Sequence, residues 1–176
     1  MPRKRKSRSR RRGTGSEPAS FAGSGLPTLL DFSPTKLLDL DEKCAYEHFF
    51  GKTLEEAREM FAETSGTCSH IYLEDLGWMG KRAFDYYVQA YIDWLQRCVP
   101  ADENEAEILA GDIEEAMSVV KIRVIVHDKD AEHGGLEKLI AAIEKMRPLA
   151  PDVNSSHARE YEASVWWLRG GEGEKC

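Results

Sequence analysis

Residues 81 to 98 carry the pattern that most limits the fold of this chain. Apolar residues recur there three and four positions apart, in two neighbouring rows with a narrow polar edge. The first row is Phe84, Val88, Ile92 and Leu95, the second is Tyr87, Tyr91, Trp94 and Cys98, and the edge is Asp85, Gln89, Asp93 and Gln96. Because an α-helix can bury so wide an apolar surface only against several neighbours, we predict a central helix from Lys81 to Cys98 in an all-α, multi-helix domain.

The flanking segments also show helical spacing and recognisable helix ends. Ser33 followed by Pro34 is typical of an N-cap and a first helical position, so we expect a first helix to begin there. Thr53 and Glu56 form a possible capping box for a second helix that ends near Thr64. Further helical segments are predicted at residues 72–79 as a short turn, from 102 to about 124 with a kink or break at Gly111, at 136–146, and at 156–168.

Residues 119–126 admit two interpretations. Val120, Ile122, Val124 and Val126 alternate as in a strand, and β-branched residues favour that state. A lone strand needs a partner, however, and no second convincing strand occurs in the chain. We therefore expect a helix.

Charge divides the chain into two parts. Eight of its 24 basic residues fall within the first twelve positions, which contain no acidic residue, and they are Arg3, Lys4, Arg5, Lys6, Arg8, Arg10, Arg11 and Arg12. The rest of the chain has 16 basic and 31 acidic residues, a formal charge of −15. We predict a disordered basic tail over residues 1–30, a helical domain over 31–170 and a flexible C-terminus over 171–176.

The spacing of the cysteines and the length of the apolar runs indicate the cellular compartment. Cys44, Cys68, Cys98 and Cys176 form no CxxC pair and no regular framework, which favours reduced thiols. No apolar segment follows the basic run, and no stretch is long enough to span a membrane. We expect a cytoplasmic protein without a membrane partner.

The chain lacks the known catalytic and nucleotide-binding motifs that would indicate an enzyme. Gly51, Lys52 and Thr53 resemble the end of a phosphate-binding loop, but Tyr46 stands where that motif requires a glycine. The chain also lacks the nucleophile elbow, the zinc-binding HExxH helix and the GxGxxG turn. The same three residues are explained by a helix start capped by threonine.

Two groups of residues could bind a metal ion. Cys44 and His48 lie four positions apart, and Cys68 and His70 could complete a site. The second group is a dense cluster that comprises His127, Asp128, Asp130, Glu132 and His133. Core packing explains the first group more simply, and a solvated loop before Gly134 and Gly135 explains the second, so we predict no cofactor.

Acidic and aromatic residues supply the candidates for contact with a partner. Glu74 and Asp75 stand close to Trp78, where they could meet a partner or stabilise a helix end. Trp166 and Trp167 are adjacent, so on a helix they point about 100° apart. We expect one of them to be buried and the other to be partly exposed as an apolar anchor.

The run Phe84-Asp85-Tyr86-Tyr87, within residues 83–92, resembles a helix of some small bacterial helical proteins. The resemblance covers about ten residues. It implies a bacterial origin and no particular activity.

Three functional hypotheses follow. In the first, the acidic body is a protein-interaction module, of an adaptor or immunity-like kind, which attracts a basic partner electrostatically. In the second, the arginine-rich tail binds nucleic-acid phosphates without reading sequence. The third is a metal-dependent enzyme that uses the histidine-containing groups. The absence of catalytic motifs favours the first hypothesis.

Overall fold

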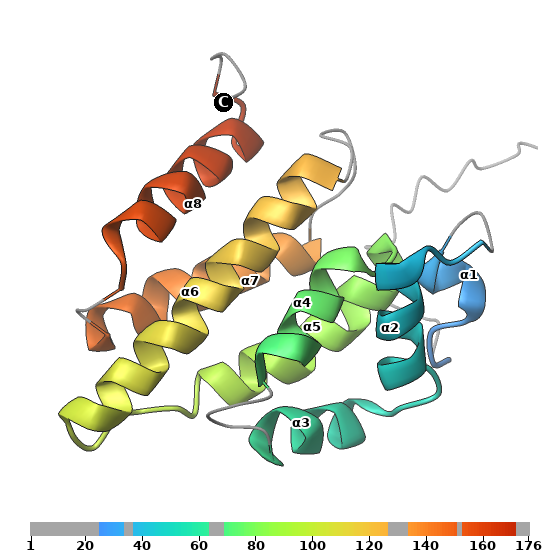
Figure 1. The fold of residues 1–176 in the computed structure, drawn as a ribbon, viewed down its shortest axis with the longest axis horizontal. Coiled ribbons are helices and arrows are strands. Elements are labelled where there is room, and N and C mark those ends of the chain that lie inside the picture. Colours follow the sequence, from blue (N-terminus) through green and yellow to red (C-terminus); the bar gives the residue numbers. More distant parts are fainter. Residues whose placement is uncertain (1–24, 34–36, 64–68, 127–133, 151–152, 172–176) are drawn as a thin grey trace, which may run out of the picture.

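The computed structural model describes residues 25–33, 37–63, 69–126, 134–150 and 153–171 of the chain (Figure 1). Regular structure in these residues is entirely helical, which confirms the predicted all-α class. The elements are α1 (Leu29–Phe32), α2 (Leu40–Phe49), α3 (Leu54–Glu63), α4 (Ser69–Trp78), α5 (Lys81–Leu95), α6 (Glu103–Val126), α7 (Gly134–Met146), a 3-10 helix η1 (Arg147–Leu149) and α8 (Ser155–Leu168). The basic run lies outside the described residues.

The predicted central helix is α5. It packs against α3 on one side and α7 on another, while α1 and α4 also contact it. Its buried residues are Ala83, Phe84, Tyr87, Val88, Ala90, Tyr91, Ile92 and Leu95. The helix ends at Leu95 rather than Cys98, because Arg97 and Cys98 donate turn hydrogen bonds to carbonyls only three residues back. The wide apolar surface read from the sequence is therefore buried on several sides, as expected.

The ambiguous residues 119–126 belong to α6, which confirms the helical interpretation. This helix packs against α4, α7 and α8, and of the alternating residues Val120 is buried while Ile122 and Val124 are partly buried. Val119 and Val120 are both buried, although they are adjacent. A kink or a break was expected at Gly111, and the break is wrong, since α6 is continuous from Glu103 to Val126.

The start of α2 corrects the expectation for Ser33 and Pro34. Ser33 is the C-cap of the short helix α1, and α2 begins at Leu40, seven residues later, with Asp39 as its N-cap. Asp39 accepts a hydrogen bond from the Glu42 backbone N–H at 2.8 Å, and the Asp39 N–H donates to the Glu42 carboxylate at 3.2 Å. This capping box satisfies two backbone donors reciprocally, which explains why the helix begins there.

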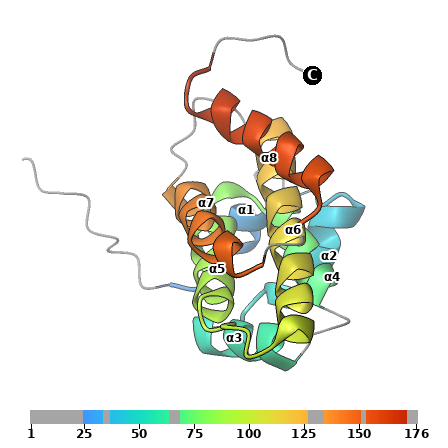
Figure 2. The ribbon, with the colours of Figure 1, turned by 90° about the vertical axis from the view of Figure 1, so that its left-hand side faces the viewer.

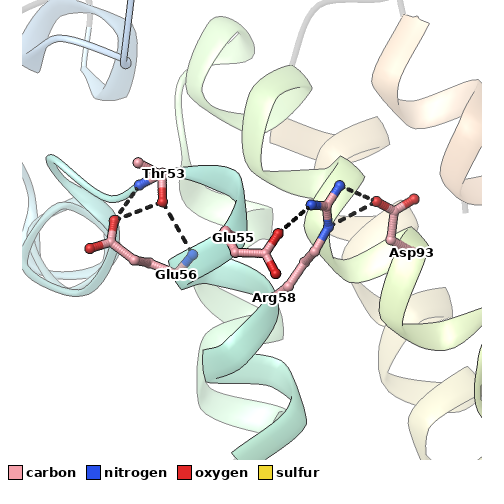
Figure 3. Close-up of polar contacts among 5 residues, drawn as sticks. All are labelled: Thr53, Glu55, Glu56, Arg58 and Asp93. Atoms are coloured by element: carbon pink, nitrogen blue, oxygen red, sulfur yellow. Dashed lines mark hydrogen bonds and ion pairs between the residues drawn. The ribbon is translucent and has the colours of Figure 1, made fainter.

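The start of α3 matches the prediction (Figure 3). Thr53 donates its backbone N–H to the Glu56 carboxylate at 2.7 Å, and the Glu56 N–H donates to the Thr53 hydroxyl at 3.2 Å. Five residues along, Arg58 donates to the Asp93 carboxylate through Nε at 2.9 Å. This ion pair joins α3 to α5.

The segment predicted as a short helical turn is a ten-residue helix, α4. It is longer than expected because neighbours on three sides bury it: α2, α5 and α6 all contact it, and Leu73, Leu76 and Met79 are buried. Gly77 lets α4 approach α6 closely, since a Cβ there would lie 3.2 Å from the Ile122 side chain.

The chain ends with α7 and α8, whose bounds lie within two residues of those predicted. Figures 1 and 2 show α8 on the outer side of α6, and Lys121 of α6 pairs with Glu160 of α8. Neither tryptophan of α8 is buried: Trp166 is 52% exposed and Trp167 is intermediate. The expectation that one of the two would be buried is therefore wrong. Among the described helices, none has the length and apolar character of a membrane span.

Candidate functional site

Packing of α2 against α4 brings two separately predicted groups of residues together. His48 comes from the candidate metal pair, and Asp75 comes from the candidate acidic pair, 27 positions later. The His48 Nδ1 lies 2.6 Å from the Asp75 Oδ2. We call the exposed residues Leu40 and Asp41 of α2 and Ile71 and Glu74 of α4 the α2–α4 surface.

The helical spacing of α2 explains the position of His48. Asp41, Cys44 and His48 are three and four residues apart, so they share one side of the helix. The His48 ring meets the Tyr72 ring of α4 edge to face, at 5.2 Å between centroids. Phe49, at the end of α2, also contacts Tyr72. The end of α2 therefore lies beside the first half of α4.

Asp75 is almost completely buried, at 5% exposure, whereas the His48 side chain is 38% exposed. Burial raises the pKa of Asp75 above its ordinary value, and this effect exceeds the lowering by the hydrogen bond and charge of His48. The carboxylates of Glu74 and Asp41 raise this pKa further. The surface is thus acidic, with one histidine held by a buried carboxyl group.

Aliphatic side chains are strongly exposed on the same helices. Leu40 is 76% exposed in the first turn of α2, between the exposed Asp39 and Asp41. Ile71 is 53% exposed and lies one turn before Asp75 on α4. Leu37, just before α2, is also exposed. The α2–α4 surface therefore combines apolar side chains with carboxylates, as protein interfaces do.

The other candidates of the α2–α4 region that the structure describes are Cys44 and Trp78. Cys44 is partly buried, and its thiol makes no hydrogen bond to His48 in the described structure. Within the described ranges, no three His, Cys, Asp or Glu residues gather closely enough to hold a metal ion. Trp78 is partly buried in the last turn of α4, and its indole Nε1 has no hydrogen-bond partner in the described structure.

The remaining candidates lie elsewhere. His127, Asp128, Asp130, Glu132 and His133 fall outside the described residues, as do Cys68 and the side chain of His70. Trp166 and Trp167 belong to α8, which packs mainly against α6. The predicted interaction residues therefore occupy two separate places on the fold.

Sequence reasoning missed Leu40 and Ile71, which are the most exposed apolar residues of the α2–α4 surface. Leu40 falls within the predicted first helix, where its spacing did not indicate exposure. Only the alternation of leucine with Asp39 and Asp41 could have indicated a helix start that faces solvent.

Comparison with known proteins adds no relative: no protein-family model matches the chain, and neither the curated proteins nor the solved structures give a significant match.

Proposed function

We propose that this chain is an acidic helical interaction module that binds a basic protein partner through the α2–α4 surface. The observation that carries the proposal is the 76% exposure of Leu40 between two exposed aspartates, on a helix anchored by the His48–Asp75 contact. When a partner removes an exposed leucine from water, the free energy falls and the complex is stabilised. Neighbouring carboxylates select a partner of opposite charge.

The net charge of the body supports the same conclusion. Outside the first twelve residues the chain carries a formal charge of −15, which accelerates the approach of a basic protein and repels nucleic-acid phosphates. Asp41 and Glu74 add local negative charge near Asp75, the partner of His48. Such steering weakens as salt screens the charges.

A pull-down with charge-reversal variants of the full chain tests this function. Asp41→Lys with Glu74→Lys reverses two charges of the α2–α4 surface. The matched control reverses two exposed carboxylates elsewhere, Glu59→Lys on α3 and Glu107→Lys on α6. The proposal expects one partner to be retained by the wild type and the control, and lost from the surface variant. Retention of the same partner by the surface variant would contradict it.

Nucleic-acid association through the basic run is the second candidate, and the eight basic residues within the first twelve positions favour it. Replacement of all eight by glutamine tests it in a titration of a labelled DNA duplex. The hypothesis expects salt-sensitive binding by the wild type and none by the variant. Equal binding by both, or no binding by the wild type at low salt, would end it.

A further inference from the structure

A groove of about 620 Å³ lies between the end of α7 and the second half of α8, far along the chain from the α2–α4 surface. Its lining combines charged, aromatic and small residues. They are Glu144, Arg147, Tyr161, Glu162, Val165, Trp166, Arg169, Gly170 and Gly171. A volume of this order accommodates a small organic molecule.

The hydroxyl of Tyr161 has no partner in this groove. Tyr161 is 2% exposed, and its hydroxyl oxygen makes no hydrogen bond to any described residue. Burial raises the pKa of Tyr161 well above its ordinary value, so the hydroxyl keeps its proton and can donate. A buried hydroxyl without a partner is unfavourable, which makes this atom a place for a ligand to bind.

Charges of both signs surround this hydroxyl. Arg147 pairs with Glu162 at 2.9 Å, and Arg169 pairs with Glu144 at 3.5 Å. All four side chains are between about two-fifths and three-fifths exposed, so these pairs are weak and can rearrange around a ligand. The lining carries two positive and two negative groups. A purely anionic ligand would meet both glutamates, and a purely cationic one would meet both arginines.

The end of α8 builds an aromatic wall. The Gly171 N–H donates to the Trp166 carbonyl at 3.0 Å, and the Gly170 N–H donates to the Trp167 carbonyl at 3.2 Å, with Gly170 at a φ of 89°. This pair of bonds is a Schellman motif, which requires a residue that tolerates positive φ. It lays Gly171 against the indole, since a Cβ on Gly171 would lie 2.3 Å from Trp166 Cδ2.

We propose that this groove binds a zwitterionic small molecule of the amino-acid type that carries an aromatic side chain. Its carboxylate accepts the hydrogen bond of Tyr161 and pairs with Arg147 or Arg169. Its ammonium group pairs with a glutamate, and its ring packs on Trp166 and Val165. This site is built by α7, η1, α8 and the residues that follow α8, and it is independent of the function proposed for the α2–α4 surface.

Isothermal titration of the full chain with three related probes tests the proposal. L-phenylalanine has both charged groups, 3-phenylpropionate lacks the ammonium group, and phenethylamine lacks the carboxylate. We expect saturable binding of phenylalanine, and binding of the two analogues at least roughly fivefold weaker. No saturation by phenylalanine up to about 10 mM, or equal binding of either analogue, would overturn the proposal.

Variants then locate the site. Tyr161→Phe removes only the hydroxyl and should weaken phenylalanine binding by roughly five- to tenfold. Tyr46→Phe on α2, whose hydroxyl makes no hydrogen bond to described residues, is the matched control and should leave binding unchanged. Gly171→Ala displaces the indole and should also weaken binding, so it provides a second test. Unchanged binding by folded Tyr161→Phe or Gly171→Ala would contradict the assignment.

Discussion

His48 holds the buried carboxyl group of Asp75 across the contact between α2 and α4, with its Nδ1 2.6 Å from the Asp75 Oδ2. This hydrogen bond is a polar link between the two helices that carry the proposed interaction surface. It spans 27 residues of sequence, so it forms only when the helices are packed.

The Asp75→Asn variant should change how stability depends on pH. Because burial raises the folded-state pKa of Asp75 above 3.8, the folded state holds this proton more tightly than the unfolded state. The contribution of Asp75 to stability is therefore greatest below the unfolded pKa and falls as the pH rises through the folded pKa. In urea titrations at several pH values just above 3.8, the wild type should lose stability relative to Asp75→Asn.

Glu74→Gln is the control for this measurement, since Glu74 is exposed and adjacent to Asp75. Glu74→Gln should change the pH dependence of the free energy of unfolding less than Asp75→Asn does. A wild type that gains stability over Asp75→Asn as the pH rises would mean that His48 favours the ionised carboxylate more strongly than burial opposes it.

Arg123→Met should destabilise the fold by about 2–4 kcal/mol. Arg123 is buried in α6, donates hydrogen bonds to the carbonyls of Gly77 and Met79 at the end of α4, and lies 4.3 Å over the Phe84 ring. Methionine keeps the apolar stem but leaves these carbonyls without their donor. Chemical denaturation measures the loss, and Arg97→Met, at an exposed position, should cost less than about 0.5 kcal/mol.

Gly80→Ala should destabilise the fold, whereas Gly111→Ala should stabilise it. A Cβ on Gly80 would lie 2.4 Å from the Asp31 carbonyl oxygen, and the Gly80 N–H donates to Phe32 at 2.7 Å. The docking of α1 would have to shift, at a cost of roughly 2 kcal/mol or more. A Cβ on Gly111, within α6, would meet no neighbouring atom within 4 Å. Because alanine favours the helix more than glycine does, Gly111→Ala should raise the free energy of unfolding by about 0.5–1 kcal/mol. Thermal unfolding should show a lower melting temperature for Gly80→Ala and a higher one for Gly111→Ala. An unchanged melting temperature for Gly80→Ala would contradict the close contact with α1.

Cys98 should resist alkylation in the folded protein. Burial, with a smaller effect of Asp112, raises the pKa of the Cys98 thiol to about 11. At about pH 8 its thiolate fraction is then roughly a hundredfold below that of a thiol with a pKa of 9.0. Peptide mapping after iodoacetamide treatment should show slow modification of Cys98 that becomes fast in denaturant. Equally fast modification in both states would contradict this environment.

Local signals in the sequence predicted much of the helical fold. The Thr53–Glu56 capping box is complete within four residues, and the apolar rows of residues 81–98 need only helical geometry to become a buried surface. The helix start predicted at Ser33 and Pro34 was wrong because Asp39 and Glu42 form a second possible helix start a few residues later. Both signals are local, and nothing in the sequence shows which one begins the helix.

The candidate site was less predictable because it depends on packing. Cys44 with His48, and Glu74 with Asp75, appeared as separate groups, and only the contact between α2 and α4 joins His48 to Asp75. The groove likewise combines Arg147 with Tyr161 and Trp166 from different helices. The exposure of Leu40 and the partial exposure of Trp167 are also results of tertiary packing.

Site-specific photo-crosslinking from position 40 tests the central claim most directly. A photoreactive phenylalanine analogue replaces Leu40 in one variant and Val99, which is 66% exposed in the segment between α5 and α6, in the other. The account predicts that position 40 crosslinks to one basic protein in the source cells and that position 99 does not. No crosslinked protein from position 40, or the same protein from both positions, would contradict an interaction surface on α2 and α4.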